Sequence, residues 1–210
     1  MKYTILTMNR PEREPYKAAI REEMKDHEEV FIECVDGRDK EQLDSHIEHY
    51  GYKINFPEWR PGEGGIWYST INAWNYCAVM NESLLVFEDD AVLRPGFASC
   101  LQEPEGIDFI TYYLPFRNNY QVMPFDLVPV YQEHGNVCLY YTPQGARKIL
   151  NMLNKEGLMW PVDIWLFKKG SINKELIGLG PKETSQIIVD VDYAIPSTIQ
   201  EDERVKIHAL

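Results

Sequence analysis

Three consecutive acids, Glu88, Asp89 and Asp90, follow a short apolar run at residues 84–87. A continuous apolar run of this length is typical of a strand buried on both faces of a mostly parallel sheet. Open α/β sheets bind ligands outside the carboxyl ends of their strands, so we expect these carboxylates to project into a crevice. Adjacent carboxylates repel each other unless positive charge lies between them, and hard divalent cations prefer carboxylate oxygens. The pattern therefore favours a metal site over its alternative, a solvated turn.

Basic residues are expected at the same edge of the sheet. A first strand at residues 3–8 ends in a turn at Asn9 and Arg10, and a helix follows from about residue 14 to residue 26. A second strand is predicted at residues 30–35, and strand, helix and strand in this order imply a parallel pair with a right-handed crossover. Arg10, Arg13 and Arg38 would then lie near the acidic cluster, which suits a diphosphate held between them and a metal.

The second predicted strand is followed by Asp36 and Gly37. Asp-Gly is a common turn pair, so a tight turn explains these residues by itself. A functional interpretation has Asp36 accepting a hydrogen bond from a nucleobase while Gly37 lets the backbone come close to it. Residue type alone does not separate the two.

Asp163 stands among bulky apolar residues at 160–165. One interpretation is a helix N-cap, because Asp is favoured there. The other is a catalytic base or an acceptor ligand in a partly dry pocket, where burial brings the pKa of a carboxyl closer to neutrality. His208, near the end of the chain, is a further candidate metal ligand.

The remaining pattern predicts one α/β domain over residues 1–210 with a mostly parallel central sheet. Further helices are expected at residues 40–50, 63–80 and 143–153, and a short one at 95–101. Further strands are expected at residues 107–113, and a pair at 128–131 and 137–141. The segment 115–127 is an aromatic, proline-bearing excursion, for which stacking on a sugar and covering a core edge are equally consistent.

Composition narrows the classes of partner. The chain holds 33 acidic and 21 basic residues, a net charge of −12, which argues against nucleic acid or an anionic membrane as a general partner. The four cysteines are widely spread and form no CxxC pair, so we expect buried free thiols rather than a zinc or redox site. No run of 18 apolar residues and no signal peptide is evident, and the expected location is cytoplasmic.

Several stretches taken together resemble glycosyltransferase family 25, which includes lipooligosaccharide and collagen galactosyltransferases. In order they are residues 9–13 (NRPER), 35–38 (VDGR), 62–65 (GEGG) with Ser69 and 73–74 (AW), 86–91 (VFEDDA), 144–150 (QGARKIL) and 161–163 (PVD). The sequence departs from the family at Thr70 and Gln200, where a histidine is common. These departures leave the role of the first position and the identity of the last metal ligand open.

The resemblance implies a nucleotide-diphosphate-sugar fold of the GT-A type with a metal-binding acidic motif. By this analogy Glu88 or Asp89 would contact the ribose and Asp90 would coordinate manganese or magnesium. Asp36 would read the uracil. Arg10 or Arg13 would face the phosphates.

The expected function is metal-dependent transfer of a hexose from a UDP-sugar to a hydroxyl acceptor, with inversion and with Asp163 as the base. The acceptor class stays open between a saccharide, a protein and a hydroxylated DNA base, and the acidic balance disfavours the last. A nucleotidyltransferase of similar fold ranks lower, because residues 9–13 contain no glycine to wrap a triphosphate. A non-catalytic nucleotide-sugar binding module is the third alternative.

Overall fold

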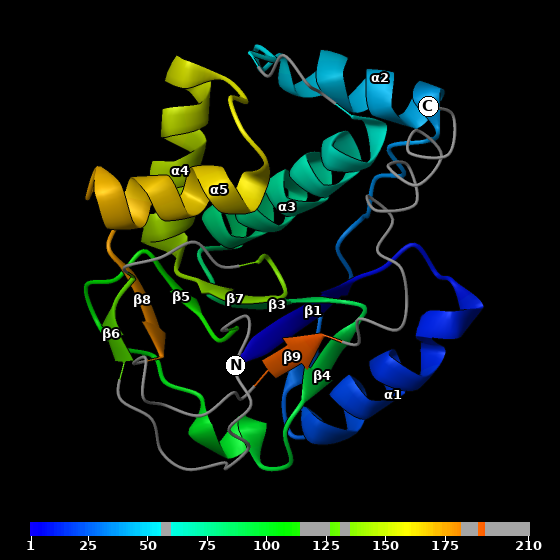
Figure 1. Ribbon diagram of the computed structural model, residues 1–210, viewed down its shortest axis with the longest axis vertical. Coiled ribbons are helices and arrows are strands. Elements are labelled where there is room, and N and C mark those ends of the chain that lie inside the picture. The colour runs from blue at the N-terminus through cyan, green and yellow to red at the C-terminus, as the bar shows by residue number, and fades with distance from the viewer. Residues whose placement is uncertain (56–59, 114–126, 131–134, 182–188, 192–210) are drawn as a thin grey trace, which may run out of the picture.

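A seven-stranded sheet forms the centre of the computed structural model, which describes residues 1–55, 60–113, 127–130, 135–181 and 189–191. The strand order is β2-β1-β3-β7-β5-β8-β6 (Figure 1). The strands are β1 Lys2–Leu6, β2 Glu28–Glu29, β3 Leu84–Glu88, β5 Phe109–Thr111, β6 Leu127–Pro129, β7 Cys138–Tyr141 and β8 Gly178–Pro181. The pairings make β1, β2, β3, β5 and β8 run in one direction and β6 and β7 in the other. The predicted α/β class with a mostly parallel sheet is confirmed.

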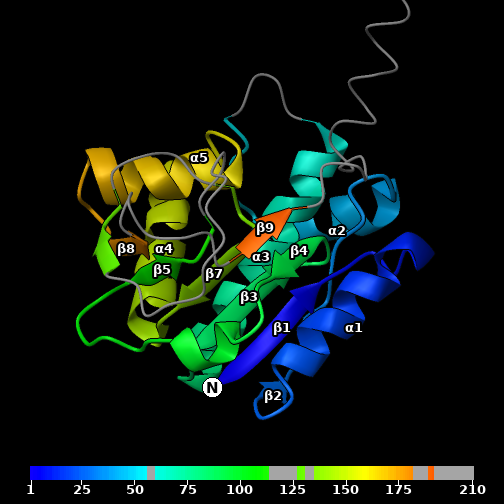
Figure 2. The same cartoon turned by 60° about the horizontal axis from the view of Figure 1, so that its bottom comes forward.

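Helices and a small ribbon cover the two faces of this sheet. On one face lie α2 Lys40–Tyr50, α3 Pro61–Met80, α4 Pro143–Glu156 and α5 Val162–Phe167 (Figures 1 and 2). On the other face lie α1 Glu14–Glu23 and the antiparallel pair β4 Ala91–Leu93 and β9 Val189–Val191. Short 3₁₀ turns at Pro11–Arg13 and Phe97–Cys100 and a π-helical turn at Lys168–Ile172 complete the described elements.

Strand β3 is buried on both faces, as its apolar run predicted. Leu84 and Val86 pack into the core beneath helices α2 to α5. Leu85 and Phe87 pack into the second core, on the side of α1. Because side chains alternate along a strand, this single strand joins the two cores, and its carboxyl end is a rigid platform for the acids that follow.

The second predicted strand, at residues 30–35, is wrong, because none of these residues belongs to a strand. Only Glu28–Glu29 pairs with β1, and Val30 adds one further hydrogen bond of 2.8 Å to a β1 carbonyl. The chain then turns toward the helices, because the amide of Val35 donates to Ser69 Oγ at 2.8 Å instead of to a neighbouring strand. A side-chain acceptor on α3 thus takes the place of the backbone hydrogen bond that a neighbouring strand would provide.

The strands predicted at 128–131 and 137–141 exist, but they do not pair with each other. Strand β7 lies between β3 and β5, and β6 pairs with β8 at the edge of the sheet. All of β7 is buried, so it takes a central position with a neighbour on each side. The helices at 40–50, 63–80 and 143–153 are confirmed, with starts or ends that shift by two or three residues for the last two. Most of the aromatic excursion at 115–127 lies outside the described residues.

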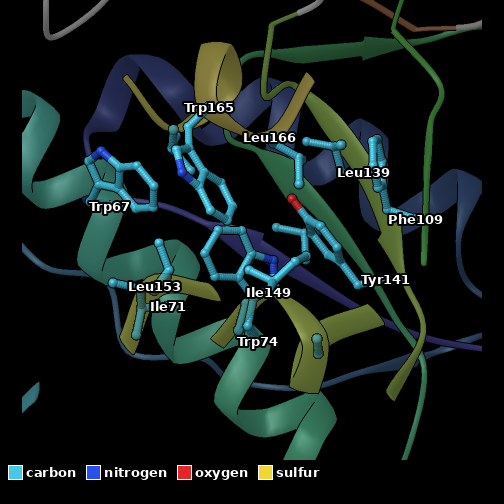
Figure 3. Packing of buried hydrophobic residues seen from close by; sticks show 14 of the residues in the cluster. Trp67, Ile71, Trp74, Phe109, Leu139, Tyr141, Ile149, Leu153, Trp165 and Leu166 are labelled. Atoms are coloured by element: carbon cyan, nitrogen blue, oxygen red, sulfur yellow. The ribbon is translucent and has the colours of Figure 1, made fainter. Parts of the chain in front are cut away.

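An aromatic cluster fastens helices α3 and α5 to the sheet (Figure 3). The Trp67 ring meets those of Trp74 and Trp165 edge-on, with centroids 6.2 and 5.8 Å apart. Trp74 in turn meets Tyr141 of β7 at 5.7 Å. The Trp67 indole N–H also donates to the Trp160 carbonyl at 2.9 Å, just before α5. The first turns of α3 and α5 are therefore held close to one another, since fully buried rings of this size dominate core packing.

Two glycines let the first turns of α3 pack against the segment that follows residue 34. A Cβ on Gly65 would lie 2.6 Å from the Val35 carbonyl oxygen, and a Cβ on Gly37 would lie 1.6 Å from the Pro61 carbonyl oxygen. Both distances fall below any real contact, and in each case the obstacle is backbone that cannot rotate away. Gly37 is thus required for helix packing, whatever it does for a ligand.

We expect Gly65→Ala to lower the free energy of unfolding by about 2 kcal/mol, because the new methyl group forces α3 away from the 35–37 backbone. Urea denaturation monitored by tryptophan fluorescence measures this. Gly51→Ala is the control, since Gly51 has a φ of +65° and no heavy atom within 4 Å of its would-be Cβ. Backbone strain alone there costs about 1 kcal/mol. A Gly65→Ala variant no less stable than Gly51→Ala would contradict the packing argument.

Candidate active site

A pocket of about 420 Å³ opens at the carboxyl ends of β1 and β3. Its walls come from the segments after β1 and at residues 34–38, the first turns of α3, the acidic residues after β3, the turn at residues 135–137 and the start of α5. Segments far apart in the sequence therefore deliver side chains to one edge of the sheet. This is the edge at which open α/β sheets bind ligands.

The acidic motif is charge-compensated by an arginine. Arg13 Nη1 lies 2.9 Å from Asp90 Oδ2, and Arg13 Nε lies 3.7 Å from Asp89 Oδ1. The side chains of Arg13 and Asp90 are only 4% and 10% exposed. The sequence predicted positive charge between these acids, and the structure places a guanidinium there. Arg13 thus contacts the acidic motif itself, at the edge where its predicted phosphate partner would bind.

Glu88 lies in a strongly negative environment. Burial raises its pKa well above the usual value, and the nearby Asp90, Asp163 and Asp89 raise it further. Burial also raises the pKa of Asp90, and the Arg13 guanidinium opposes that rise. The carboxylates of two separate segments, 88–90 and 163, are therefore close enough to interact electrostatically within one pocket.

The oxygen chemistry of this motif suits a hard divalent cation. Asp90 Oδ1 is buried and has no hydrogen-bond partner among the described residues, so one carboxylate oxygen is available for a ligand. Within the part of the chain that the structure describes, no three His, Cys, Asp or Glu side chains are arranged as a complete metal cage. Any cation there would need oxygens from a bound substrate as well, as Mg²⁺ commonly does with phosphates. His208 lies outside the described residues.

Asp36, Gly37 and Arg38 also line the pocket. The Arg38 amide donates to Asp36 Oδ1 at 2.9 Å, so the tight turn expected of an Asp-Gly pair is present. The same carboxylate still belongs to the pocket wall. The turn and the ligand interpretations are therefore compatible, because the turn fixes the Asp36 side chain at the pocket.

Asn9 and Arg10 lie on the loop after β1 but are not among the residues that line the pocket. Asn9 adopts a left-handed backbone conformation with a φ of 53°, and its Oδ1 accepts from Lys17 Nζ at 3.4 Å. Arg10 Nη1 lies 4.0 Å from Glu12 Oε1. Their predicted contacts with a nucleotide stay predictions.

Asp163 lines the pocket and is the second residue of α5. The N-cap position belongs to Pro161, so the capping interpretation of Asp163 is wrong. Asp163 Oδ1 accepts from the amide of Ile164 at 2.8 Å, which orients the carboxylate. The bond from Trp67 to the Trp160 carbonyl holds the segment that precedes it.

Asn136 and Tyr113 are among the pocket residues that were not predicted from the sequence. Asn136 is 5% exposed, lies in the turn before β7, and donates from Nδ2 to Thr70 Oγ1 at 3.5 Å. Tyr113, 4% exposed, follows β5. Neither is charged or part of a recognisable motif, so no signal in the sequence marks them. Their position depends on β5 and β7 lying next to each other, which only the topology shows.

All four cysteines, which the structure describes in full, are free thiols, and two of them, Cys77 and Cys138, are buried as expected. Cys34 is partly buried at the pocket wall, where its sulfur accepts from the Thr7 amide at 3.1 Å. Burial raises the pKa of Cys34 to about 11. This thiol is therefore protonated at neutral pH and is a poor nucleophile.

No protein-family model matches this sequence, and no curated protein matches it either. Among solved structures, a mutant of Drosophila β-1,4-galactosyltransferase 7 in complex with manganese, UDP-Gal and xylobiose is similar, with 10% identity and a TM-score of 0.45. The alignment covers 97% of this chain and 79% of that one. The resemblance to family 25 therefore rests on the sequence landmarks, and the conclusions below rest on this chain's own residues. Among the described helices, none has the length and apolar character needed to cross a membrane.

We expect Glu88→Gln to raise the free energy of unfolding by about 1 kcal/mol, because it removes a carboxylate that burial and three acids disfavour. Thermal unfolding measures this. Glu82→Gln is the matched control on the segment before β3. Glu82 lies 2.7 Å from Lys2, whose contact lowers the pKa of Glu82, so its neutralisation should lower the melting temperature. Shifts of the same sign in both variants would contradict the charge argument.

Proposed function

We propose that this chain is a glycosyltransferase of the GT-A type, similar to family 25, that transfers a hexose from a UDP-sugar to a hydroxyl acceptor. The observation that carries the proposal is that a single pocket gathers the acidic motif after β3, the Asp36 turn and Asp163. A donor diphosphate, a nucleobase and an acceptor hydroxyl each find a suitable group there. The whole chain over residues 1–210 is proposed to form one domain.

The nucleotide would lie along the wall formed by residues 34–38 and the first turn of α3. Asp36 offers a carboxylate to the uracil, and Gly37 lets the backbone of this wall come close to the nucleobase. The first turn of α3 lines the same wall, and a helix N-terminus favours the negative charge of a diphosphate. Arg38 adds positive charge, and Asn9 and Arg10 are proposed to approach the phosphates from the loop after β1.

Asp89 and Asp90 are the residues that would hold Mn²⁺ or Mg²⁺, with Glu88 or Asp89 at the ribose. The buried oxygen of Asp90 without a hydrogen bond is the feature that supports this assignment. A bound cation supplies Lewis-acid neutralisation of the charge that builds on the departing UDP. Arg13 fixes the orientation of Asp90 from the side away from the free oxygen. His208 is a further proposed ligand.

Asp163 is proposed to act as the general base. It would take the proton of the acceptor hydroxyl while that oxygen attacks the anomeric carbon and the bond to UDP breaks, so the configuration at that carbon inverts. Its environment suits this role, because the Asp163 carboxylate is oriented by the Ile164 amide and lies near Glu88 and the acidic motif. A positioned base of this kind contributes about 10²–10⁴ in rate.

We expect Asp90→Ala to abolish transfer and metal-dependent UDP binding. The reason is that it removes the proposed metal-ligating oxygen. UDP release from several UDP-sugars with and without Mn²⁺, together with calorimetric titration of UDP, tests this. Asp90→Asn is a second variant, since Asp90→Ala leaves Arg13 without its closest partner. Asp44→Ala on the exposed face of α2 is the control, because Asp44 lies outside the site pocket. Normal turnover in both Asp90 variants would remove the metal from the proposal.

For Asp163→Asn we expect UDP-sugar binding close to that of the wild type, with the transfer rate reduced by about 10²–10⁴. The amide keeps the shape of the carboxylate but does not take up a proton. Calorimetry gives the binding constant, and a coupled assay of UDP release gives the rate. Unchanged transfer would exclude Asp163 as the base. Donor binding without turnover in the wild type, with saccharide and peptide acceptors supplied, would favour a non-catalytic binding module.

A further inference from the structure

A buried amide oxygen in the pocket wall has no partner. Asn136 is 5% exposed, and its Oδ1 makes no hydrogen bond to any described residue. A buried acceptor left without a bond costs about 1–3 kcal/mol, and native structures keep few of them. Because Asn136 lines the site pocket, a bound ligand is the natural source of the missing donor.

The orientation of this amide follows from its neighbour. Asn136 Nδ2 lies 3.5 Å from Thr70 Oγ1, and the Thr70 hydroxyl donates its own proton to the Ile66 carbonyl at 2.8 Å. Thr70 can therefore only accept from Asn136, so the NH₂ group of the amide must face Thr70. The oxygen is left on the other side, without a hydrogen-bond partner in the part of the chain that the structure describes.

The order of the strands places Asn136 on one side of the acidic motif. Residues 34–38, which are proposed to bind the nucleotide, would lie on the other side. Strands β1, β3 and β7 are consecutive in the sheet, about 4.8 Å apart. The acids follow β3, and the Glu88 amide donates to the Val137 carbonyl at 2.9 Å, so Asn136 is adjacent to Glu88. A UDP-sugar with its nucleotide near Asp36 and its diphosphate at the acidic motif would bring its sugar to the β7 side.

The groups around this position select the chemistry of the ligand. Glu88, Asp90 and Asp163 carry carboxyl groups, and the free atom of Asn136 is an acceptor too. A ligand that satisfies such a surface must bring hydrogen-bond donors. The hydroxyl groups of a hexose do so at several positions.

We propose that Asn136 is a sugar-binding residue whose Oδ1 accepts a hydrogen bond from a hydroxyl group of the donor hexose. This assignment rests on the proposed function. It adds a determinant of donor choice that lies outside the acidic motif and outside the family landmarks. The residue would distinguish the sugar from the nucleotide, because the proposed uridine site at Asp36 and the proposed diphosphate site at the acidic motif do not involve Asn136.

The test compares UDP with UDP-galactose and UDP-glucose by calorimetry in the presence of Mn²⁺, for the wild type and for Asn136→Leu. The expected result is unchanged affinity for UDP and about tenfold weaker binding of the preferred UDP-hexose, the effect of one hydrogen bond. Asn136→Ala serves as a second variant. Asn75→Leu on α3 is the control, because the Asn75 amide donates to the Ile71 carbonyl and does not line the pocket. It should change neither affinity.

Stability provides a separate measurement. Since Oδ1 has no hydrogen-bond partner among the described residues, Asn136→Leu should melt within about 2 °C of the wild type or above it. A fall of many degrees in both Asn136 variants would show a structural role and overturn the assignment. Equal losses of UDP and UDP-hexose affinity would also overturn it, while leaving the proposed function intact. If the wild type binds neither UDP nor a UDP-hexose, the proposed function fails, and the sugar assignment fails with it.

Discussion

The buried contact between Arg13 and Asp90 is the interaction on which the geometry of the site depends. It joins the turn before α1 to the residues that follow the carboxyl end of β3. A buried ion pair adds little net stability, because desolvation offsets the attraction, yet removing one partner is costly. The pair therefore acts mainly on specificity: it fixes one oxygen of Asp90, while the other is buried without a hydrogen bond to any described residue.

The rest of the pocket depends on packing that has no chemistry of its own. Trp67 contacts Trp74 and Trp165, and Trp74 contacts Tyr141 of β7. This packing fixes the positions of the first turns of α3 and α5. The contact of Gly65 and Gly37 then closes the gap between α3 and the 34–38 segment. Asp163 and Asp36 face one cavity because these two contacts are made at once. Changes in the core far from any ligand should therefore alter the site.

The sequence predicted the parts of the fold that local pattern determines. The strand at residues 84–87 was predicted correctly because a continuous apolar run has a short-range meaning, and α2 was correct at both ends. The strand at 30–35 failed because the amide of Val35 is satisfied by Ser69, 34 positions away, which no local pattern reveals. The pairing of β6 and β7 failed for the same reason, since β8, which pairs with β6, lies far along the chain.

The same distinction between local pattern and distant contacts applies to the candidate site. Charged residues at strand ends could be found from the sequence, but their protein partners could not. Arg13 lies against Asp89 and Asp90 in the structure, and the metal predicted at these acids stays a prediction. Asn136 was missed because its defining property, an unsatisfied buried oxygen, exists only in three dimensions.

Glu88, Asp90 and Asn136 share one condition, and it explains why they belong together. Each keeps a polar group that folding leaves poorly satisfied: a crowded carboxyl, an oxygen without a hydrogen bond, and an amide oxygen without one. Stability alone would remove such groups, and proteins retain them where a ligand completes them. All three residues line the pocket, and the two oxygens without hydrogen bonds are acceptors, so the completing ligand must bring donors or positive charge to them. A hexose held next to a divalent cation provides both.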